Sequence, residues 1–216
     1  IKTDGVGNPD RAKTRIVILG NKDTMEWTKA DCYAPVVSQP IVRLMTSLAV
    51  KYKRVLKQGD CKNAFCHPVL PANEVTVVKP PHCPISKPNT YWLLHKTLYG
   101  LRRSPQHWFK HLAKRFHDIG LKVTKHEDCL FFGQLIPDRP PLYVSLFVDN
   151  FIYFSEDPEV EKKFETELAE RVNVDFMGDA EYFLGTHFTW TRHDDGNVSV
   201  HLSQEAYANM LVDAMG

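Results

Sequence analysis

The sequence predicts an α+β fold in which an antiparallel sheet is backed by helices. Helical and strand-like patterns follow one another along its 216 residues, but they lack the regular strand–helix repeat that builds a parallel sheet. Apolar residues make up 43% of the chain and charged residues 25%, as in ordinary globular proteins. No apolar run approaches the roughly 20 residues of a membrane span, so we expect no membrane partner.

Four helices are predicted from apolar stripes with helical spacing. Each begins at a Ser or Asp, whose side chain can cap the first turn. The expected ranges are 38–52, 104–120, 157–172 and 203–211. In the third helix, acidic residues lie beside the apolar stripe, and we expect them to face solvent. These residues are Glu159, Glu161, Glu165 and Glu167.

Strands are predicted where β-branched and aromatic residues cluster between turn signals. The first is Thr14–Leu19, which Gly20-Asn21 closes, and a short strand-like stretch precedes Asp60. Proline-rich segments at 80–88 and 137–141 are predicted to be loops. The other expected strands are Glu74–Val78, Tyr91–Leu94, Leu130–Gln134, Leu142–Val148, Phe151–Phe154, Tyr182–Trp190 and Asn197–His201.

The charge of the chain is divided between its two halves. Residues 1–115 contain 20 Lys and Arg against 7 Asp and Glu, whereas residues 116–216 contain 7 against 19. Such an asymmetry favours a polyanionic partner for the basic half. The alternative is that the two halves pack together and neutralise each other.

Cysteine usage argues against a disulfide framework and against a zinc knuckle. The number is odd and there is no Cys-x-x-Cys pair, which favours a reducing compartment. The five cysteines are Cys32, Cys61, Cys66, Cys83 and Cys129. Because the sequence does not open with Met, we expect it to be a fragment of a longer protein.

Two acidic positions are the candidates for chemistry. Asp149-Asn150 separates two apolar strands, as in a tight hairpin whose turn residues tolerate positive φ. Asp60 follows a short strand-like stretch. Carboxylates on neighbouring strands can hold a pair of divalent ions that promote phosphoryl transfer. Taken singly, each position would be no more than a turn or a strand-end cap.

The ordered set of motifs resembles the reverse transcriptase of Ty1/copia-type LTR retrotransposons. The resemblance covers nearly the whole chain, and the order of the blocks makes it specific. The blocks are Lys13–Val17, Tyr33–Val37, Ile41–Leu44, Gln58–Phe65, Leu98–Pro105 with Trp108, Phe147–Asn150, Tyr182–Gly185 and Leu202–Gln204. The resemblance implies an RNA-directed DNA polymerase, which is a nucleotidyltransferase.

The resemblance also implies roles for single residues. Asp60 and Asp149 match the family's metal-binding aspartates, with Asn150 beside them, and the implied cofactor is two Mg²⁺ ions, replaceable by Mn²⁺. Phe65 matches the aromatic gate that rejects a ribose 2′-hydroxyl. The implied dNTP-binding residues are Lys13, Arg15, Cys61, Phe65, Tyr99 and Gly100, and the implied primer grip is Leu184 and Gly185. Each of these roles has a structural alternative. The alternatives are core packing for Phe65, a solvated strand face for Arg15, a structural turn for Tyr99 and Gly100, and ordinary sheet positions for Leu184 and Gly185.

The family's right-hand architecture implies fingers at 1–35 and 68–103 and a palm at 36–67 and 104–201. Residues 202–216 would begin the thumb or connection. The implied partners are an RNA or DNA template with its primer, dNTP, and the RNase H and integrase of a Pol polyprotein. A cytoplasmic location in virus-like particles, or a nuclear one, is the corresponding expectation.

Two departures from the family pattern bear on activity. Asn150 stands where the family has a second aspartate, and its amide offers a metal one neutral oxygen without charge. The stretch before the primer grip, 172–178, has neither Lys nor Arg where the family commonly has Lys. The alternatives are therefore a polymerase weakened at its metal motif and a decayed domain that only binds nucleic acid. A third is an unrelated α+β domain with a simple turn at Asp149-Asn150.

Overall fold

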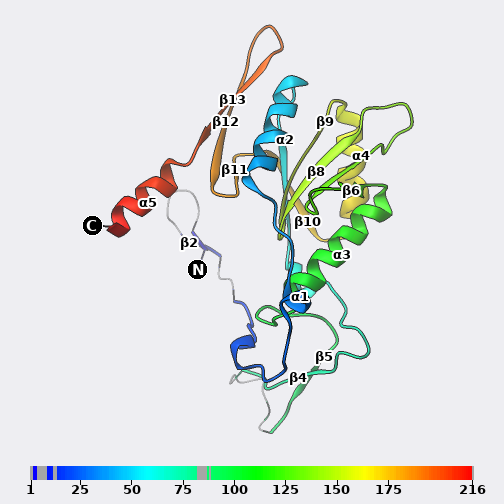
Figure 1. Cartoon of the computed structure of the whole chain (residues 1–216), viewed down its shortest axis with the longest axis vertical. Coiled ribbons are helices and arrows are strands. Elements are labelled where there is room, and N and C mark those ends of the chain that lie inside the picture. Colours follow the sequence, from blue (N-terminus) through cyan, green and yellow to red (C-terminus); the bar gives the residue numbers. More distant parts are fainter. Residues whose placement is uncertain (1, 4–8, 12–13, 82–86, 88, 216) are drawn as a thin grey trace. The chain divides into compact units, whose positions relative to one another are not determined.

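The computed structural model describes residues 2–3, 9–11, 14–81, 87 and 89–215 (Figure 1). The chain forms two compact units. The first comprises Ile1–Tyr33 and Phe65–Trp108, and the second comprises Ala34–Ala64 and Phe109–Gly216. In the part of the chain that the structure describes, no helix combines the length and the apolar character that crossing a membrane requires.

The second unit is built on a six-stranded antiparallel sheet, in the order β10-β3-β9-β8-β7-β6. The central strands β8 and β9 are rich in β-branched and aromatic residues, and most of their side chains are buried. The strands are β3 (Lys57–Cys61), β6 (Lys122–Val123), β7 (Leu130–Gly133), β8 (Leu142–Phe147), β9 (Asn150–Ser155) and β10 (Val174–Asp179).

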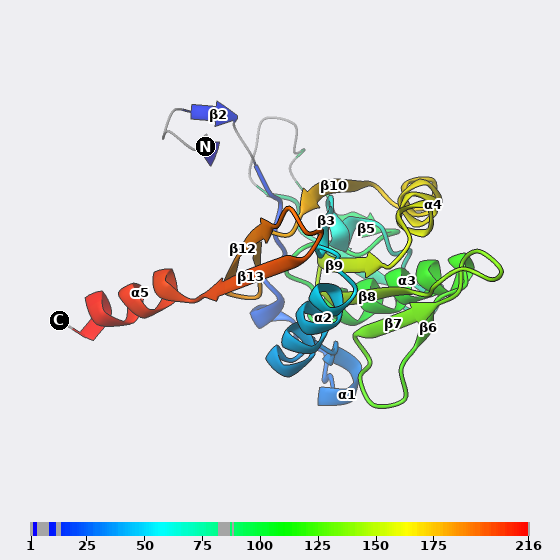
Figure 2. The ribbon, with the colours of Figure 1, turned by 90° about the horizontal axis from the view of Figure 1, so that it is seen from above.

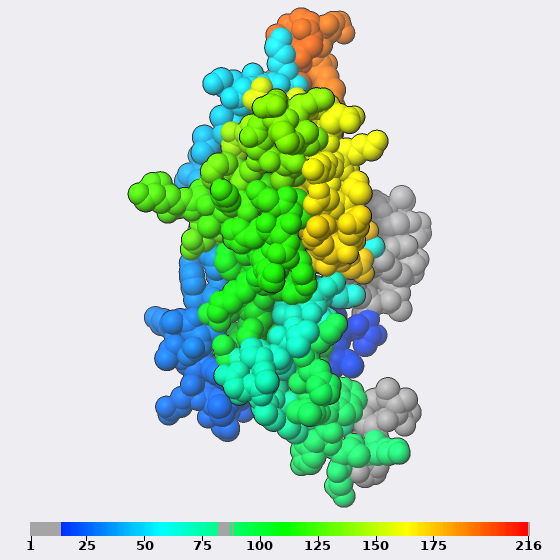
Figure 3. Space-filling view, turned by 90° about the vertical axis from the view of Figure 1, so that its right-hand side faces the viewer, coloured from blue at the N-terminus to red at the C-terminus, as the bar shows by residue number. Residues whose placement is uncertain are grey.

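Two helices cover one face of this sheet. These are α3 (Ser104–Ile119), whose residues from Phe109 onward belong to this unit, and α4 (Pro158–Ala169). Figure 3 shows α3 in green and α4 in yellow lying side by side. The ring of Phe116 contacts those of Phe131, Phe151 and Phe164, which join α3 to the sheet and to α4. Aromatic pairs of this kind add to the area that is buried.

Helix α2 (Gln39–Lys51) packs on the opposite side of the sheet. Its buried residues Val42 and Met45 form one apolar cluster with Ile152 and Phe154 of β9. A three-stranded sheet joins the same cluster through Phe183, and it leads to α5 (Glu205–Met215), which has no buried residue (Figure 2). Its strands are β11 (Tyr182–Phe183), β12 (Thr186–Arg192) and β13 (Val198–Ser203).

The first unit has less regular structure. Its elements are β1 (Lys2–Thr3), β2 (Pro9–Arg11), the 3₁₀ helix η1 (Gly20–Lys22), α1 (Lys29–Cys32), β4 (Thr76–Val78) and β5 (Trp92–Leu94). Here β1 pairs with β2, and β4 with β5, all antiparallel. A second 3₁₀ helix, η2 (Ala64–Cys66), lies at the junction of the two units.

The predicted strand at Thr14–Leu19 is wrong. This segment forms no ladder, although the N–H of Ile18 donates to the carbonyl of Tyr99 (2.8 Å). Ile16, Val17 and Leu19 are exposed, so this run of consecutive apolar residues does not mark a buried strand. All four predicted helices are present, as α2, α3, α4 and α5.

Candidate functional site

Asp60 lies on β3 between two strands that each place a polar side chain beside it. Its register partner on β9 is Asn150, and its partner on β10 is Asp175. Partners directly opposite each other in antiparallel strands project to the same face of the sheet. Asn150, Asp60 and Asp175 therefore form a row, here named the Asp60 row, across three strands of the second unit.

Asp149 lies in the tight turn between β8 and β9. Phe147 pairs with Asn150, so the turn residues are Val148 and Asp149, and Asn150 already belongs to β9. The residue with positive φ is Val148, at 57°, which corrects the expectation that Asp149-Asn150 supplies the turn geometry. A β-branched residue is strained in this region, and such strain is concentrated at functional sites.

A backbone hydrogen bond connects the two candidate aspartates. The N–H of Cys61, the residue after Asp60, donates to the carbonyl of Asp149 (2.8 Å). Cys61 itself is 1% exposed, and burial, followed by the charges of Asp60 and Asp149, raises the pKa of its thiol. The thiol therefore stays protonated, and its burial leaves the Cys61 side chain no access to a ligand at the surface. Both carboxylates act electrostatically on one buried atom, which is consistent with neighbouring positions.

The donor chemistry of this region fits Mg²⁺. Asp60 and Asp149 offer carboxylate oxygens, both side chains are half-buried, and Asn150 adds an amide whose Nδ2 lies 3.4 Å from Asp149 Oδ1. Within the described residues, no group of three His, Cys, Asp or Glu side chains is placed to hold an ion. Two carboxylates suit Mg²⁺, which keeps several waters and takes its other ligands from substrate phosphates.

Gly59 is required by the packing beneath the Asp60 row. Its cross-strand partner is Phe151, and a Cβ on Gly59 would lie 2.3 Å from Phe151 Cζ. The ring therefore occupies the space that a side chain would need. This contact explains why a glycine precedes Asp60 in the motif.

Three of the implied nucleotide-binding residues of the first unit are in contact, with Tyr99 between Phe65 and Arg15. The rings of Phe65 and Tyr99 meet edge to face, with centroids 5.2 Å apart, and the guanidinium of Arg15 lies 5.4 Å from the Tyr99 centroid. Gly100 has φ of 88°, and a Cβ there would lie 2.0 Å from the carbonyl oxygen of Ile18. Lys13 lies outside the described residues.

Leu184 and Gly185 form the tight turn between β11 and β12, with φ of 47° and 75°. This turn divides the single strand expected at Tyr182–Trp190. The side chain of Gln39, at the start of α2, donates to the carbonyl of Leu184 (2.7 Å). The neighbouring Phe183 meets Phe147 of the Asp149 hairpin edge to face, at 6.2 Å. The residue that precedes the implied primer grip is thus packed against the strand that leads to Asp149.

Two polar residues near Asp60 are not among the site residues that the sequence predicts. Lys62 Nζ lies 2.5 Å from Asp175 Oδ1, which joins the end of β3 to β10. Lys62 follows β3 in a turn, so its spacing of two from Asp60 does not predict a shared face. Asp175 gives no sequence signal either, because its place opposite Asp60 depends on the pairing of strands far apart in sequence.

The acidic face expected on the third predicted helix is partly wrong. Glu161 is fully buried, accepts a hydrogen bond from the N–H of Ser155 (3.0 Å), and pairs with Arg54 (3.0 Å) and Lys57 (3.2 Å). Glu165 pairs with Lys57 (2.9 Å) and accepts a hydrogen bond from the Tyr153 hydroxyl (2.7 Å). These charges hold α4 to β3 and β9 rather than facing solvent.

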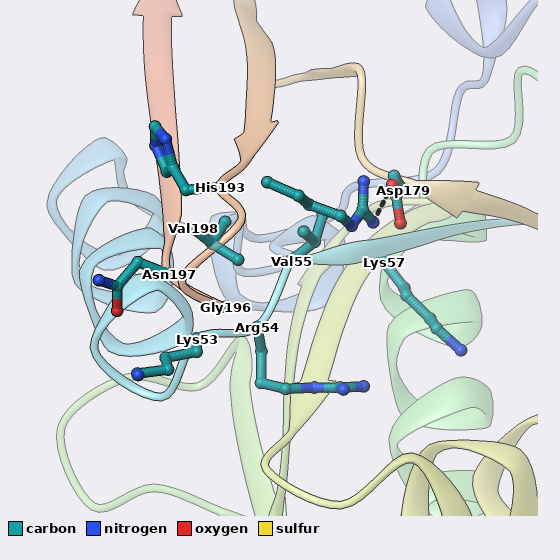
Figure 4. Close-up of a pocket in the computed structure, with 10 residues that line it drawn as sticks. Lys53, Arg54, Val55, Lys57, Asp179, His193, Gly196, Asn197 and Val198 are labelled. Carbon is teal, nitrogen blue, oxygen red and sulfur yellow. Dashed lines mark hydrogen bonds and ion pairs between the residues drawn. The ribbon is translucent and has the colours of Figure 1, made fainter.

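A basic concavity of about 270 Å³ lies at the Lys57 end of β3, away from Asp60 (Figure 4). Its Arg54 and Lys57 side chains point away from His193 and bind the acids of α4. Asp179 in the same concavity is paired with Arg192. Because these cations already have anionic partners, the concavity is a poor candidate for anion binding. Its lining residues are Lys53–Val55, Lys57, Asp179, Arg192, His193 and Gly196–Val198.

The sequence matches the family described as reverse transcriptase (RNA-dependent DNA polymerase) over residues 2–216. The chain therefore belongs to that family. It is similar to the retrovirus-related Pol polyprotein from transposon RE1 of Arabidopsis thaliana, with 28% identity over 207 residues. It is also similar to the Pol polyprotein from transposon TNT 1-94 of Nicotiana tabacum, with 24% identity over 214 residues. Both relatives are of the copia type that the motif order indicates.

The chain corresponds to a small part of these relatives. The matches cover 95% of this chain but 14% of the RE1 polyprotein, and 99% of this chain but 16% of the TNT 1-94 polyprotein. The Ty1-H Gag-Pol polyprotein of Saccharomyces cerevisiae is 27% identical over 150 residues, which are 67% of this chain and 8% of that protein. No solved structure matches the chain.

Proposed function

We propose that this chain catalyses DNA synthesis on an RNA or DNA template by phosphoryl transfer at Asp60 and Asp149. The observation that carries the proposal is the hydrogen bond from the Cys61 N–H to the Asp149 carbonyl, beside the Asp60–Asn150 pair. This arrangement brings together two acidic residues from distant parts of the sequence, Asp60 on β3 and Asp149 in the turn that precedes the neighbouring strand β9. Membership of the reverse transcriptase family supports the same reaction.

Asp60 and Asp149 would hold two Mg²⁺ or Mn²⁺ ions. When bound, such ions lower the pKa of an attacking hydroxyl and neutralise charge on the transferred phosphoryl group. Asn150 contributes a neutral amide in place of a carboxylate, which lowers the negative charge available to a cation. We therefore expect weak metal binding and a reduced rate rather than a change of chemistry.

The residues of the first unit would select and hold the nucleotide. The edge-to-face contact with Tyr99 fixes the ring of Phe65, which suits a group that excludes a 2′-hydroxyl by steric contact. The planar guanidinium of Arg15 can bind phosphate oxygens in pairs. We propose that the first unit corresponds to the fingers and the second to the palm, with the primer end held at Leu184 and Gly185.

The similarity to Pol polyproteins supports a proposal about the other domains that accompany this chain. Because the matched relatives are Pol polyproteins of which this chain corresponds to a small part, we propose that it works alongside other Pol domains, such as RNase H and integrase. The nucleic-acid partner would be a template with its primer.

The second candidate function is nucleic-acid binding without catalysis. The observations that favour it are Asn150 in the metal motif and an acid, Asp175, within the stretch where the family commonly has Lys. A binding module of this kind would keep a salt-dependent affinity for nucleic acid carried by its basic residues. It would also keep that affinity when Asp60 is replaced by Ala.

Primer extension on RNA and DNA templates separates the two candidates. The polymerase proposal predicts Mg²⁺- or Mn²⁺-dependent extension by the wild-type chain and at least tenfold faster extension by Asn150→Asp, since each carboxylate strengthens cation binding. If Asn150→Asp extends a primer and the wild-type chain does not, the wild-type chain has lost its catalytic activity through this one position. If neither protein extends a primer while both bind it, the binding module is correct.

A further inference from the structure

Lys62 places a cation on the same face of the sheet as Asp60. Its backbone N–H donates to the carbonyl of Asn173 (2.8 Å), so the pairing of β3 with β10 continues past the end of β3. Lys62 itself lies in the turn after β3, so its direction is given by its ion pair. Its ammonium lies 2.5 Å from a carboxylate oxygen of Asp175, which shares the face of Asp60.

Lys62 places its positive charge beside two acids of the Asp60 row. Asp60 and Asp175 are directly opposite each other in the register of β3 and β10. Like charges in such positions repel, and a nearby cation reduces the repulsion. Lys62 supplies it at the Asp175 end of the row.

The pair of Lys62 and Asp175 is too exposed to hold the fold together. The side chains are 44% and 52% exposed. Exposed ion pairs contribute roughly 0–1 kcal/mol to stability, because water screens them and their side chains lose freedom. Lys62 can therefore exchange Asp175 for another anion at little cost, as its flexible stem permits.

We propose that Lys62 is a phosphate-binding residue of the nucleotide site and that Asp175 is its resting partner. The inference rests on the proposed function, because the ligand is the triphosphate of an incoming nucleotide. A triphosphate beside Asp60 competes with Asp175 for the ammonium. Lys62 then moves from the carboxylate to a phosphate oxygen, and the affinity for triphosphate depends on how strongly Asp175 holds it.

The two partners have opposite effects in a binding measurement. Inorganic tripolyphosphate is titrated into the full chain in a calorimeter with Mg²⁺ present. Lys62→Met is expected to weaken binding about tenfold, as loss of a charge-assisted contact does. Asp175→Asn is expected to tighten binding about threefold, because Lys62 is released. An ion pair with only a structural role would lower the melting temperature in both variants and leave both affinities unchanged, which would overturn the proposal.

A double variant separates release of Lys62 from a simple change of charge. In Lys62→Met/Asp175→Asn, the gain from Asp175→Asn should disappear, because there is no lysine left to release. A gain that persists in the double variant shows that Asp175 acts through space, and the assignment of a resting partner is then wrong. The matched controls are Lys114→Met and Asp179→Asn, which break exposed ion pairs on α3 and at the far end of β10.

The calorimetric measurement of tripolyphosphate binding does not require the chain to synthesise DNA. If wild-type chain binds tripolyphosphate but extends no primer, the proposed function fails, while the signs of the two variants still decide the role of Lys62. If wild-type chain extends primers but Lys62→Met binds tripolyphosphate as wild type does, the inference alone fails.

Discussion

Gly59 and Phe151 are cross-strand partners whose contact leaves no room for a side chain at Gly59. The Phe151 ring also contacts Phe116 of α3 and Phe164 of α4, so it belongs to the core that supports the sheet. On the residue after Gly59, the chain places Asp60 on the opposite face. The position of the candidate catalytic aspartate thus depends on the packing of a buried aromatic ring beneath the sheet.

Gly59→Ala should destabilise the chain by about 1–3 kcal/mol, because the new methyl overlaps the Phe151 ring and forces strands apart. Urea unfolding followed by circular dichroism measures this change. The control is the same substitution in a Phe151→Leu background, where the smaller side chain gives way and the added cost should fall. Equal costs in both backgrounds would show that the ring is not the obstacle.

Asn150→Asp should make the stability of the chain depend on Mg²⁺. The new carboxylate lies next to Asp149 and opposite Asp60, so without metal the repulsion should lower the melting temperature. Added Mg²⁺ should reverse the loss, because an ion that binds only the folded state stabilises it. Thermal unfolding with and without Mg²⁺ tests this, and an equal melting temperature in both conditions would argue against a cation site here.

Glu161→Gln should cost about 2–4 kcal/mol, because it removes the buried counter-charge of Arg54 and one of the two carboxylates that pair with Lys57. Glu159→Gln is the matched control on the same helix, since Glu159 is exposed, and its cost should stay below about 0.5 kcal/mol. Chemical denaturation of both variants gives the comparison. Similar small costs would mean that Glu161 is not held by these cations.

Stability should decline above about pH 10 through Tyr153. Burial, and then the hydrogen bond to Glu165, raises the pKa of the Tyr153 hydroxyl above its ordinary value of 10.0. A group whose pKa is raised by folding contributes stability that is complete below its unfolded pKa and is lost as pH rises above it. Lys57 acts in the same direction above its ordinary pKa of 10.5. Burial lowers the pKa of its ammonium, but its hydrogen bonds and charge interactions with Glu165 and Glu161 together outweigh that lowering.

Ultraviolet titration of the phenolate band measures this directly. Tyr153 should remain un-ionised while exposed tyrosines titrate, until the chain unfolds. In Tyr153→Phe, the fall in unfolding free energy between about pH 9 and about pH 11 should be smaller than in wild type. An equal fall in both proteins would mean that Tyr153 ionises as freely as an exposed tyrosine.

The sequence predicts local elements better than their pairing. The helices follow from apolar stripes and capping residues, as at Asp157, whose side chain accepts a hydrogen bond from the N–H of Glu159. Strand β10 is not predicted, because Gly178 and the exposed Met177 interrupt its apolar pattern. Its place beside β3 is set by register, which periodicity along one segment does not encode.

In the candidate site, too, some features are predicted from the sequence and others are seen only in the fold. The family resemblance predicts Asp60 and Asp149, whereas the positive φ at Val148 and the ion pair of Lys62 with Asp175 emerge only from the folded chain. The burial of Glu161 is missed for a similar reason. Helical spacing places it beside the apolar stripe, but gives no sign that Arg54 and Lys57 lie opposite.

The most direct measurement is Mg²⁺-dependent primer extension on an RNA template by wild type, Asp60→Asn and Asp149→Asn, with the exposed-pair variant Asp179→Asn as control. We expect each site variant to lose at least about a thousandfold in rate while still binding the primer–template. Asp179→Asn should stay within about twofold of wild type. Extension that survives Asp60→Asn at the wild-type rate would contradict the assignment of the active site.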